Sequence, residues 1–137
     1  MNKFLRVLGV VLVLASCDDP NPSCCDEPQL IVLGESFSIK EGETVEVESS
    51  TVTLTFSELL NDSLCPYDTT CLTNGTLAIT INISGTNKTL SIGDQSLPTA
   101  TYKNYTIELQ RLIYPTKSDE KANNSSTYAV QMVITRA

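Results

Sequence analysis

The chain contains no histidine and no tryptophan, and basic residues are scarce. The lack of histidine excludes Ser-His-Asp and Cys-His catalytic arrangements, together with the usual general base near neutral pH. It also removes the commonest protein ligand for zinc, copper and iron. Nine Lys and Arg residues stand against 16 Asp and Glu residues, giving a net charge of −7. With no basic cluster, we expect no nucleic-acid partner.

Carboxylates are plentiful, but their arrangement does not indicate catalysis or metal binding. A pair of carboxylates can hydrolyse glycosides, yet a small β domain offers little concavity around such a pair. Acidic pairs such as Asp119-Glu120 lack the alternate spacing of a calcium loop. The cysteines do not form the two CxxC knuckles of a zinc site. We therefore expect a protein with no catalytic residues, no cofactor and no metal.

The first seventeen residues have the order of a secretory signal peptide that ends at a cysteine. Lys3 and Arg6 form a basic head, residues 7–14 are apolar, and Ala15-Ser16 lead into Cys17. This apolar run is too short to cross a bilayer, which needs about 20 residues. The order is similar to the lipobox of bacterial lipoproteins, in which the cysteine sulfur receives a diacylglycerol. The resemblance implies lipidation of Cys17, which would become the mature N-terminus.

The domain organisation follows from this cleavage site. We expect a signal peptide over 1–16, a lipidated flexible tether over 17–28 and a β domain over 29–137. The tether, CDDPNPSCCDEP, is rich in proline and acidic residues and has no apolar period. Loss of Lys3 and Arg6 with the signal peptide changes the net charge from −7 to −9.

The expected location is the envelope of a Gram-negative bacterium. Several acyl chains hold a protein durably on a membrane, so the lipid on Cys17 would provide the membrane contact. We favour the outer membrane, at its periplasmic face or the cell surface, over the inner membrane.

Apolar and polar residues alternate strictly through most of the remaining chain. A period of two indicates strands with one buried face, and hence antiparallel sheets. We therefore predict an all-β, Ig-like antiparallel sandwich of seven or eight strands, with a small barrel as the alternative. A single helical turn over Phe56–Leu60 and a polar turn over Ser118–Ser126 are the expected interruptions. The alternating segments are residues 37–39, 45–48, 51–56, 77–83, 90–92, 105–109 and 128–134.

Four cysteines besides Cys17 allow three disulfide connectivities. An exported chain meets an oxidising compartment, where disulfides persist. We favour Cys65–Cys71, which closes a short local loop, together with Cys24–Cys25 in the tether. Because adjacent cysteines bond only through a strained ring, Cys24 and Cys25 alternatively stay reduced or join another chain.

The segment Asp62-Ser63-Leu64-Cys65-Pro66, with Cys71 and Gly75 following, is the most distinctive internal motif. It resembles a family of small bacterial lipoproteins that share Asp-Ser-Arg-Cys-Pro, a second cysteine at this spacing and a glycine before a strand. The resemblance implies a β-sandwich on a lipid tether and no specific activity. The chain departs from the motif at Leu64, where arginine is usual, and at Thr73-Asn74, where Trp-Ala is common.

The closed loop offers a candidate binding surface. Binding residues concentrate on loops that a stiff scaffold holds, and Tyr67 and Asp68 lie inside the expected ring. The simpler interpretation is a loop pinned against proteolysis, with Tyr67 packed onto the end of the sheet.

Three functions are therefore open. The first is a non-catalytic interaction module for an envelope protein or a glycan, the second a passive accessory subunit of an envelope complex, and the third a protease inhibitor. An aromatic patch around Tyr67, Tyr102 and Tyr114 would favour the first, and an uncovered edge strand would favour the second.

Overall fold

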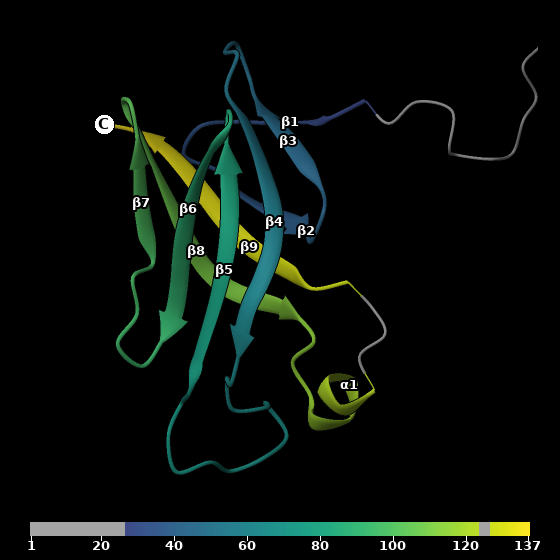
Figure 1. Cartoon of the computed structure of the whole chain (residues 1–137). Helices are drawn as coiled ribbons and strands as arrows, with labels where there is room; N and C mark the ends of the chain where they lie inside the picture. The colour runs from purple at the N-terminus through teal and green to yellow at the C-terminus, as the bar shows by residue number, and fades with distance from the viewer. Residues whose placement is uncertain (1–26, 124–126) are drawn as a thin grey trace, which may run out of the picture.

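Two β-sheets packed face to face form the domain in a computed structural model, which describes residues 27–123 and 127–137 (Figure 1). The alternating segments predicted from the sequence all form strands. In chain order the elements are β1 (Gln29–Ile31), β2 (Ser36–Lys40), β3 (Thr44–Val47), β4 (Thr53–Asp62), β5 (Thr76–Ile83), β6 (Thr86–Gly93), β7 (Thr99–Tyr102), β8 (Tyr105–Tyr114), α1 (Ser118–Ala122) and β9 (Ala129–Arg136).

The predicted β-sandwich is confirmed. One sheet has the order β1-β3-β4-β5-β6 and the other β2-β9-β8-β7. β1 and β3 run parallel, and the other pairs in the described part are antiparallel. The strand count is nine, against seven or eight expected, because β1 and β7 span only three and four residues. β1 has a single buried residue and β7 has none, so neither displays a buried face with a period of two.

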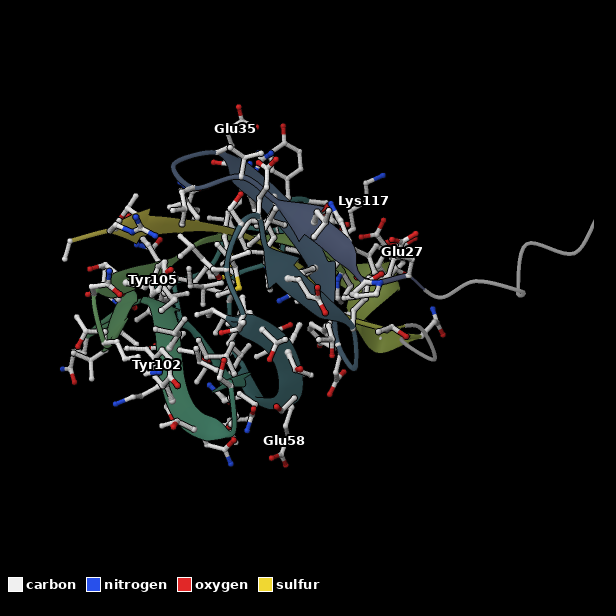
Figure 2. The ribbon with its side chains drawn as sticks, turned by 90° about the horizontal axis from the view of Figure 1, so that it is seen from above. Glu27, Glu35, Glu58, Tyr102, Tyr105 and Lys117 are labelled. Carbon is white, nitrogen blue, oxygen red and sulfur yellow. A yellow bond between two sulfur atoms is a disulfide. The ribbon has the colours of Figure 1, made fainter. Side chains whose placement is uncertain are left out.

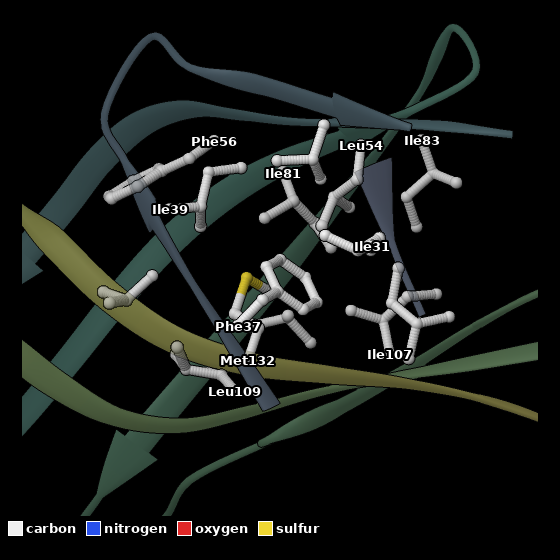
Figure 3. Close-up of a cluster of buried hydrophobic side chains, with 14 of the residues drawn as sticks. Ile31, Phe37, Ile39, Leu54, Phe56, Ile81, Ile83, Ile107, Leu109 and Met132 are labelled. Carbon is white, nitrogen blue, oxygen red and sulfur yellow. The ribbon is translucent and has the colours of Figure 1, made fainter. Parts of the chain in front are cut away.

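The core lies between the two sheets and consists of the alternating apolar residues (Figure 3). On β5, Leu77, Ile79, Ile81 and Ile83 are all completely buried, while the residues between them face outward. Burial of each such side chain stabilises the fold by about 1.5–3 kcal/mol. The other sheet contributes mainly Phe37, Ile39, Ile107, Leu109, Val130, Met132 and Ile134.

The helical turn expected over Phe56–Leu60 is wrong, because this segment continues β4. Its pairing with β5 shifts register between Phe56 and Glu58 and again between Leu59 and Asn61. Each shift inserts an extra residue into the strand and interrupts the period of two. Leu59 is therefore half-buried and Leu60 exposed, a pattern that imitates a helix in the sequence.

The polar segment that begins at Ser118 is not only a turn. It forms the short helix α1, whose first turn carries Asp119 and Glu120. The Glu120 carboxylate accepts hydrogen bonds from the Thr116 and Lys117 amides, at 2.9 and 3.0 Å. Acceptors at this position satisfy amides that the first turn of a helix leaves without partners.

The disulfide-bonded connection and the N-terminal segment join the sandwich at different places. β4, β6 and β8 finish at the same end, which we call the loop end, and the long β4–β5 connection, the β6–β7 connection and α1 gather there (Figure 1). β3 instead pairs with the first residues of β4, since Val45 lies opposite Leu54, and β1 pairs with the outer side of β3. The N-terminal segment therefore joins the domain away from the loop end.

The predicted signal peptide and the predicted sites Cys17, Cys24 and Cys25 lie outside the described residues. Within residues 27–123 and 127–137, no helix has the length and apolar character needed to span a membrane.

Candidate interaction surface

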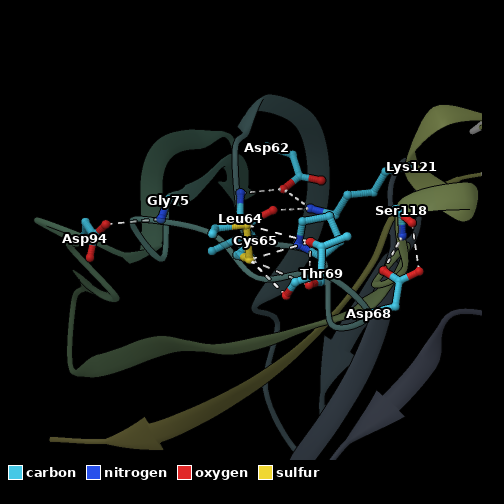
Figure 4. The surroundings of a disulfide bond; sticks show 11 residues. Asp62, Leu64, Cys65, Asp68, Thr69, Gly75, Asp94, Ser118 and Lys121 are labelled. Atoms are coloured by element: carbon cyan, nitrogen blue, oxygen red, sulfur yellow. Dashed lines mark hydrogen bonds and ion pairs between the residues drawn. A yellow bond between two sulfur atoms is a disulfide. The ribbon is translucent and has the colours of Figure 1, made fainter.

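The predicted Cys65–Cys71 disulfide is confirmed, with an S–S distance of 2.11 Å and Cα atoms 5.9 Å apart (Figure 4). It closes a ring within residues 63–75, the segment between β4 and β5 that we call the disulfide loop. In chain-entropy estimates, a covalent closure removes freedom from the unfolded chain and stabilises the folded one.

The two ends of the disulfide loop meet in a tight neck. The Ser63 amide donates to the Thr76 carbonyl, and the Cys65 amide donates to the Asn74 carbonyl, both at 2.9 Å. Gly75 has a φ of +71°, and a Cβ atom there would lie 1.8 Å from the Ser63 carbonyl oxygen. Only glycine fits this crossing, both for its backbone conformation and for the space available.

An ion pair with little exposure to solvent joins the end of β4 to α1. Asp62 ends β4, and its side chain is only 4% exposed. One carboxylate oxygen lies 2.7 Å from Lys121 Nζ, and the other accepts a hydrogen bond from the Tyr128 hydroxyl at 3.0 Å. Lys121 also donates to the Leu64 carbonyl at 2.9 Å. These contacts draw β4, the loop, α1 and the start of β9 together.

Asp68 forms a second connection to α1. Its carboxylate accepts hydrogen bonds from the Ser118 amide at 2.8 Å and the Ser118 hydroxyl at 2.7 Å. These bonds stabilise the charged form, so they lower the pKa of Asp68 below its ordinary value. The pKa of Glu120 is lowered too, by the Thr116 and Lys117 amides. Asp68 therefore holds the loop in place instead of projecting freely to a partner.

Tyr67 is 88% exposed and Leu72 is fully exposed on the same loop. The Tyr67 amide donates to the Thr116 carbonyl at 2.8 Å, so the backbone is anchored while the ring stands in solvent. The packing of Tyr67 onto the end of the sheet, expected under the simpler interpretation, is therefore not observed. Five of the seven exposed large apolar side chains in the described part lie at or near the loop end, namely Leu60, Tyr67, Leu72, Leu97 and Ile113.

A shallow cavity of about 270 Å³ opens beside Tyr67. Leu64, Ile92 and Leu112 contribute apolar lining, and the disulfide forms part of one wall. Arg111 lines the same cavity, where its Nε donates to the Gln131 side chain. The arrangement offers an apolar floor with two basic side chains, Arg111 and Lys121, in its lining.

The tyrosines considered together from the sequence do not form one patch. Tyr114 ends β8 near the loop end, whereas Tyr102 lies in the β7–β8 hairpin at the opposite end of the sandwich (Figure 1). Tyr102 is paired with Tyr105 across that hairpin, and the two lie on the same side of the molecule in Figure 2. Across the described residues, no three His, Cys, Asp or Glu side chains gather as metal ligands would.

The sequence predicts the disulfide loop, but it does not predict the side chains of Asp62 and Lys121 that hold the loop against α1. Asp62 was noted only as part of the motif, and Lys121 lies in a segment without apolar period, 59 residues further along the chain. A polar turn rich in charged residues carries no sign that its lysine faces inward. The one available signal was the position of a carboxylate at the end of a strand whose alternate residues are buried.

Comparisons with known proteins identify no relative of this chain. No protein-family model, no curated protein and no solved structure matches it.

Proposed function

We propose that the protein is a lipid-anchored interaction module of a bacterial envelope, which binds another envelope protein through Tyr67 and the surface around it. The single observation that carries this proposal is an almost fully exposed aromatic ring on a loop whose backbone is fixed on several sides. Tyrosine provides a large contact area with few rotatable bonds. A pre-ordered loop loses little conformational entropy when it binds.

The position of the surface agrees with an anchored protein. The N-terminal segment enters through β1, which pairs with β3, and β3 pairs with the first residues of β4. The disulfide loop lies at the other end of β4. With lipid on Cys17, the tether would approach the domain away from the loop end. Tyr67 and Leu72 would then be accessible to a partner in the periplasm or at the cell surface.

The family suggested by the Asp62–Gly75 motif is part of this proposal. In support, the two motif cysteines are bonded and Gly75 occupies a crossing that admits only glycine. At Leu64, where arginine is usual, the side chain packs against the core and lines the cavity. The basic side chains that line this cavity are Arg111 of β8 and Lys121 of α1.

Substitution of Tyr67 tests the proposal. Tyr67→Ala should reduce capture of envelope proteins from detergent-solubilised membranes several-fold, because the ring supplies the exposed contact area. The melting temperature should stay nearly unchanged, since an exposed side chain contributes within about 0.5 kcal/mol to stability. Tyr67→Phe is the matched control, because it keeps the ring and should retain most of the capture. Unchanged capture by Tyr67→Ala, with or without a loss of stability, would contradict the assigned surface.

One observation favours the second function, that of an accessory subunit. The outer edge of β2 has no neighbouring strand in the described part. Uncovered edges pair readily with strands of other chains.

A further inference from the structure

The side of the sandwich that carries β1 and β2 presents two open sheet edges. β2 pairs only with β9, and β1 pairs only with β3, so no strand of the described residues covers the outer edge of either. The chain passes from one sheet to the other through residues 32–35. Because this connection is only four residues long, the end of β1 and the start of β2 lie on the same side of the sandwich.

The hydrogen bonds around β2 show which backbone groups face outward. The Glu41 amide donates to the Tyr128 carbonyl at 2.8 Å, in line with the β2–β9 ladder. The Lys40 amide turns the other way and donates to Glu43. Because successive backbone groups alternate in direction along an antiparallel edge, those of Ser36 and Ser38 also point away from β9.

Two cavities lie near these strands, one between the start of β1 and the β2–β3 turn and the other between β1 and the first residues of β2. Their volumes are about 380 and 300 Å³, and both are lined by Gln29. Glu27 and Glu43 line the first cavity, and Glu35 lines the second. Figure 2 shows Glu27 and Glu35 at opposite ends of the β1–β2 region. Between them, Leu30 is 61% exposed in the second cavity and offers apolar contact.

Charge selects among the strands that such an edge accepts. A second copy of this chain, with the same net charge of −7, would be repelled electrostatically. The preceding segment of this chain is also unsuitable, because Asp18, Asp19 and Asp26 would approach a groove lined by glutamates. An extended segment with basic residues near its ends meets Glu35 just before β2 and, at the other end of the strand, Glu43, whose carboxylate accepts a hydrogen bond from the Lys40 amide. Lys40 is the single basic residue of β2, and it lies on the exposed outer face.

We propose that the outer edge of β2 binds an extended, basic segment of another protein, which pairs with the backbone of Ser36 and Ser38 and extends the four-stranded sheet. Main-chain hydrogen bonds supply affinity in this mode of recognition, and alternate side chains of the added strand supply specificity. Leu30 and Val32 line the opposite wall and contact the apolar side chains of that strand. The inference deepens the accessory function and is independent of the Tyr67 surface.

A synthetic peptide of the sequence acetyl-Lys-Thr-Val-Thr-Val-Thr-Lys-amide is a direct probe. Titrated into the isotope-labelled domain, it should shift the amide resonances of Ser36 and Ser38 and slow their hydrogen exchange by about tenfold or more at saturation. The same peptide with glutamate in place of both lysines should bind about tenfold more weakly or worse at low salt. Peptide N-methylated on the edge that faces β2 should not bind, and this control leaves the protein unchanged.

Substitutions at one position separate the backbone contact from the side chain. Ser38→Pro removes the outward amide and should abolish peptide binding, because proline is tolerated on a free edge but cannot donate. Ser38→Ala removes only the hydroxyl and should bind as the parent does. Tyr67→Ala should leave peptide binding unchanged, so failure at the disulfide loop and failure at the β2 edge are distinguishable.

Three results would overturn the proposal. Equal binding of the lysine and glutamate peptides would remove the argument from charge. Shifts confined to the disulfide loop would place the contact elsewhere. Shifts of the Ser36 and Ser38 amides that depend on protein concentration without peptide would identify a second copy as the occupant.

Discussion

At the scale of single residues, the loop end depends on a few side chains that each contact several partners. Asp62 is the clearest case, because it is almost fully buried and bound to both Lys121 and Tyr128. A buried charge that keeps its partner is tolerated, whereas one left alone is very costly. The free energy of unfolding should therefore respond more to the loss of one member of this cluster than to changes in the exposed loop.

Asp62→Ala should lower the free energy of unfolding by about 3 kcal/mol, because it leaves the Lys121 ammonium without its counter-ion. Urea denaturation of the parent and the variant measures the difference. Asp119→Ala is the control, since that carboxylate is exposed on α1 and should contribute within about 0.5 kcal/mol. An equal loss of unfolding free energy in the two variants would show that the contacts of Asp62 do not stabilise the fold.

Two glycines with positive φ allow the neck of the loop to be tested. Gly42 has a φ of +85° and open space around its Cβ position, whereas Gly75 has a φ of +71° and the Ser63 carbonyl at 1.8 Å from that position. Gly42→Ala should cost about 1–2 kcal/mol, the price of a left-handed alanine. Gly75→Ala should cost clearly more, because the backbone must also move. Thermal melts of both variants give the comparison, and a Gly75→Ala loss no larger than that of Gly42→Ala would contradict the close crossing.

At the scale of elements, bulged strands deliver the loop and the helix to the same end of the sandwich. β4 shifts register twice before Asp62, and β8 shifts register after Leu109 and after Leu112. Both strands are regular where they cross the core and irregular where they approach the loop end. The irregular halves carry Leu60 and Ile113 to the surface, beside the disulfide loop.

The difference between regular and bulged parts of the strands explains how much of the structure could be predicted from the sequence. Regular half-strands such as Thr53–Phe56 and all of β5 show their buried face as a period of two, and these predictions are confirmed. Bulges erase that period, so Phe56–Leu60 resembled a helical turn. The Cys65–Cys71 bond was predictable from spacing, but the contacts of Asp68 with Ser118 were not. They join residues 50 positions apart in two polar segments that have no pattern to align.

The contact of α1 with the disulfide loop should weaken in acid. The pKa values of Asp68 and Glu120 are both lowered in the folded protein, chiefly by hydrogen bonds from Ser118 and from the Thr116 amide respectively. Each carboxylate therefore contributes stability that is present above its ordinary pKa of about 4 and is lost as the pH falls through the lowered folded value. The protection factors of the Ser118 and Tyr67 amides should fall below about pH 4, measured by hydrogen exchange corrected for intrinsic rates.

Asp68→Asn provides the control for this pH effect. The amide oxygen still accepts a hydrogen bond but does not titrate, so protection of the Ser118 amide should become less dependent on pH. Identical pH profiles for the parent and the variant would show that Asp68 does not control this contact.

At the scale of the whole molecule, the proposed anchor and the two proposed binding surfaces lie at different places on the sandwich. The N-terminal segment enters beside β1, the open edge of β2 lies on the same side, and Tyr67 stands at the loop end. A partner at one surface would leave the other accessible. The strong negative charge opposes contact with anionic headgroups, so membrane binding would depend on the lipid alone.

Cys17→Ser tests the anchor directly. The sulfur is the acceptor for the diacylglycerol, so the variant should accumulate as uncleaved precursor and should lack the lipid adduct in mass spectrometry. On phase separation with a nonionic detergent, the parent should enter the detergent phase and the variant the aqueous phase. A variant that is processed and still enters the detergent phase would refute lipidation at Cys17.

The pairing of β2 with β9 also determines when the domain can fold. Ser36 of β2 lies opposite Val133 of β9. β2 is near the start of the domain and cannot form its pairing until β9 has been synthesised. Contacts between such distant segments slow folding, because a long loop must close before the contact stabilises anything. A chain that emerges from its N-terminus can assemble β3–β6 early, since those strands are sequential neighbours. The four-stranded sheet closes only after the whole chain has emerged, and until then β2 has neither edge covered.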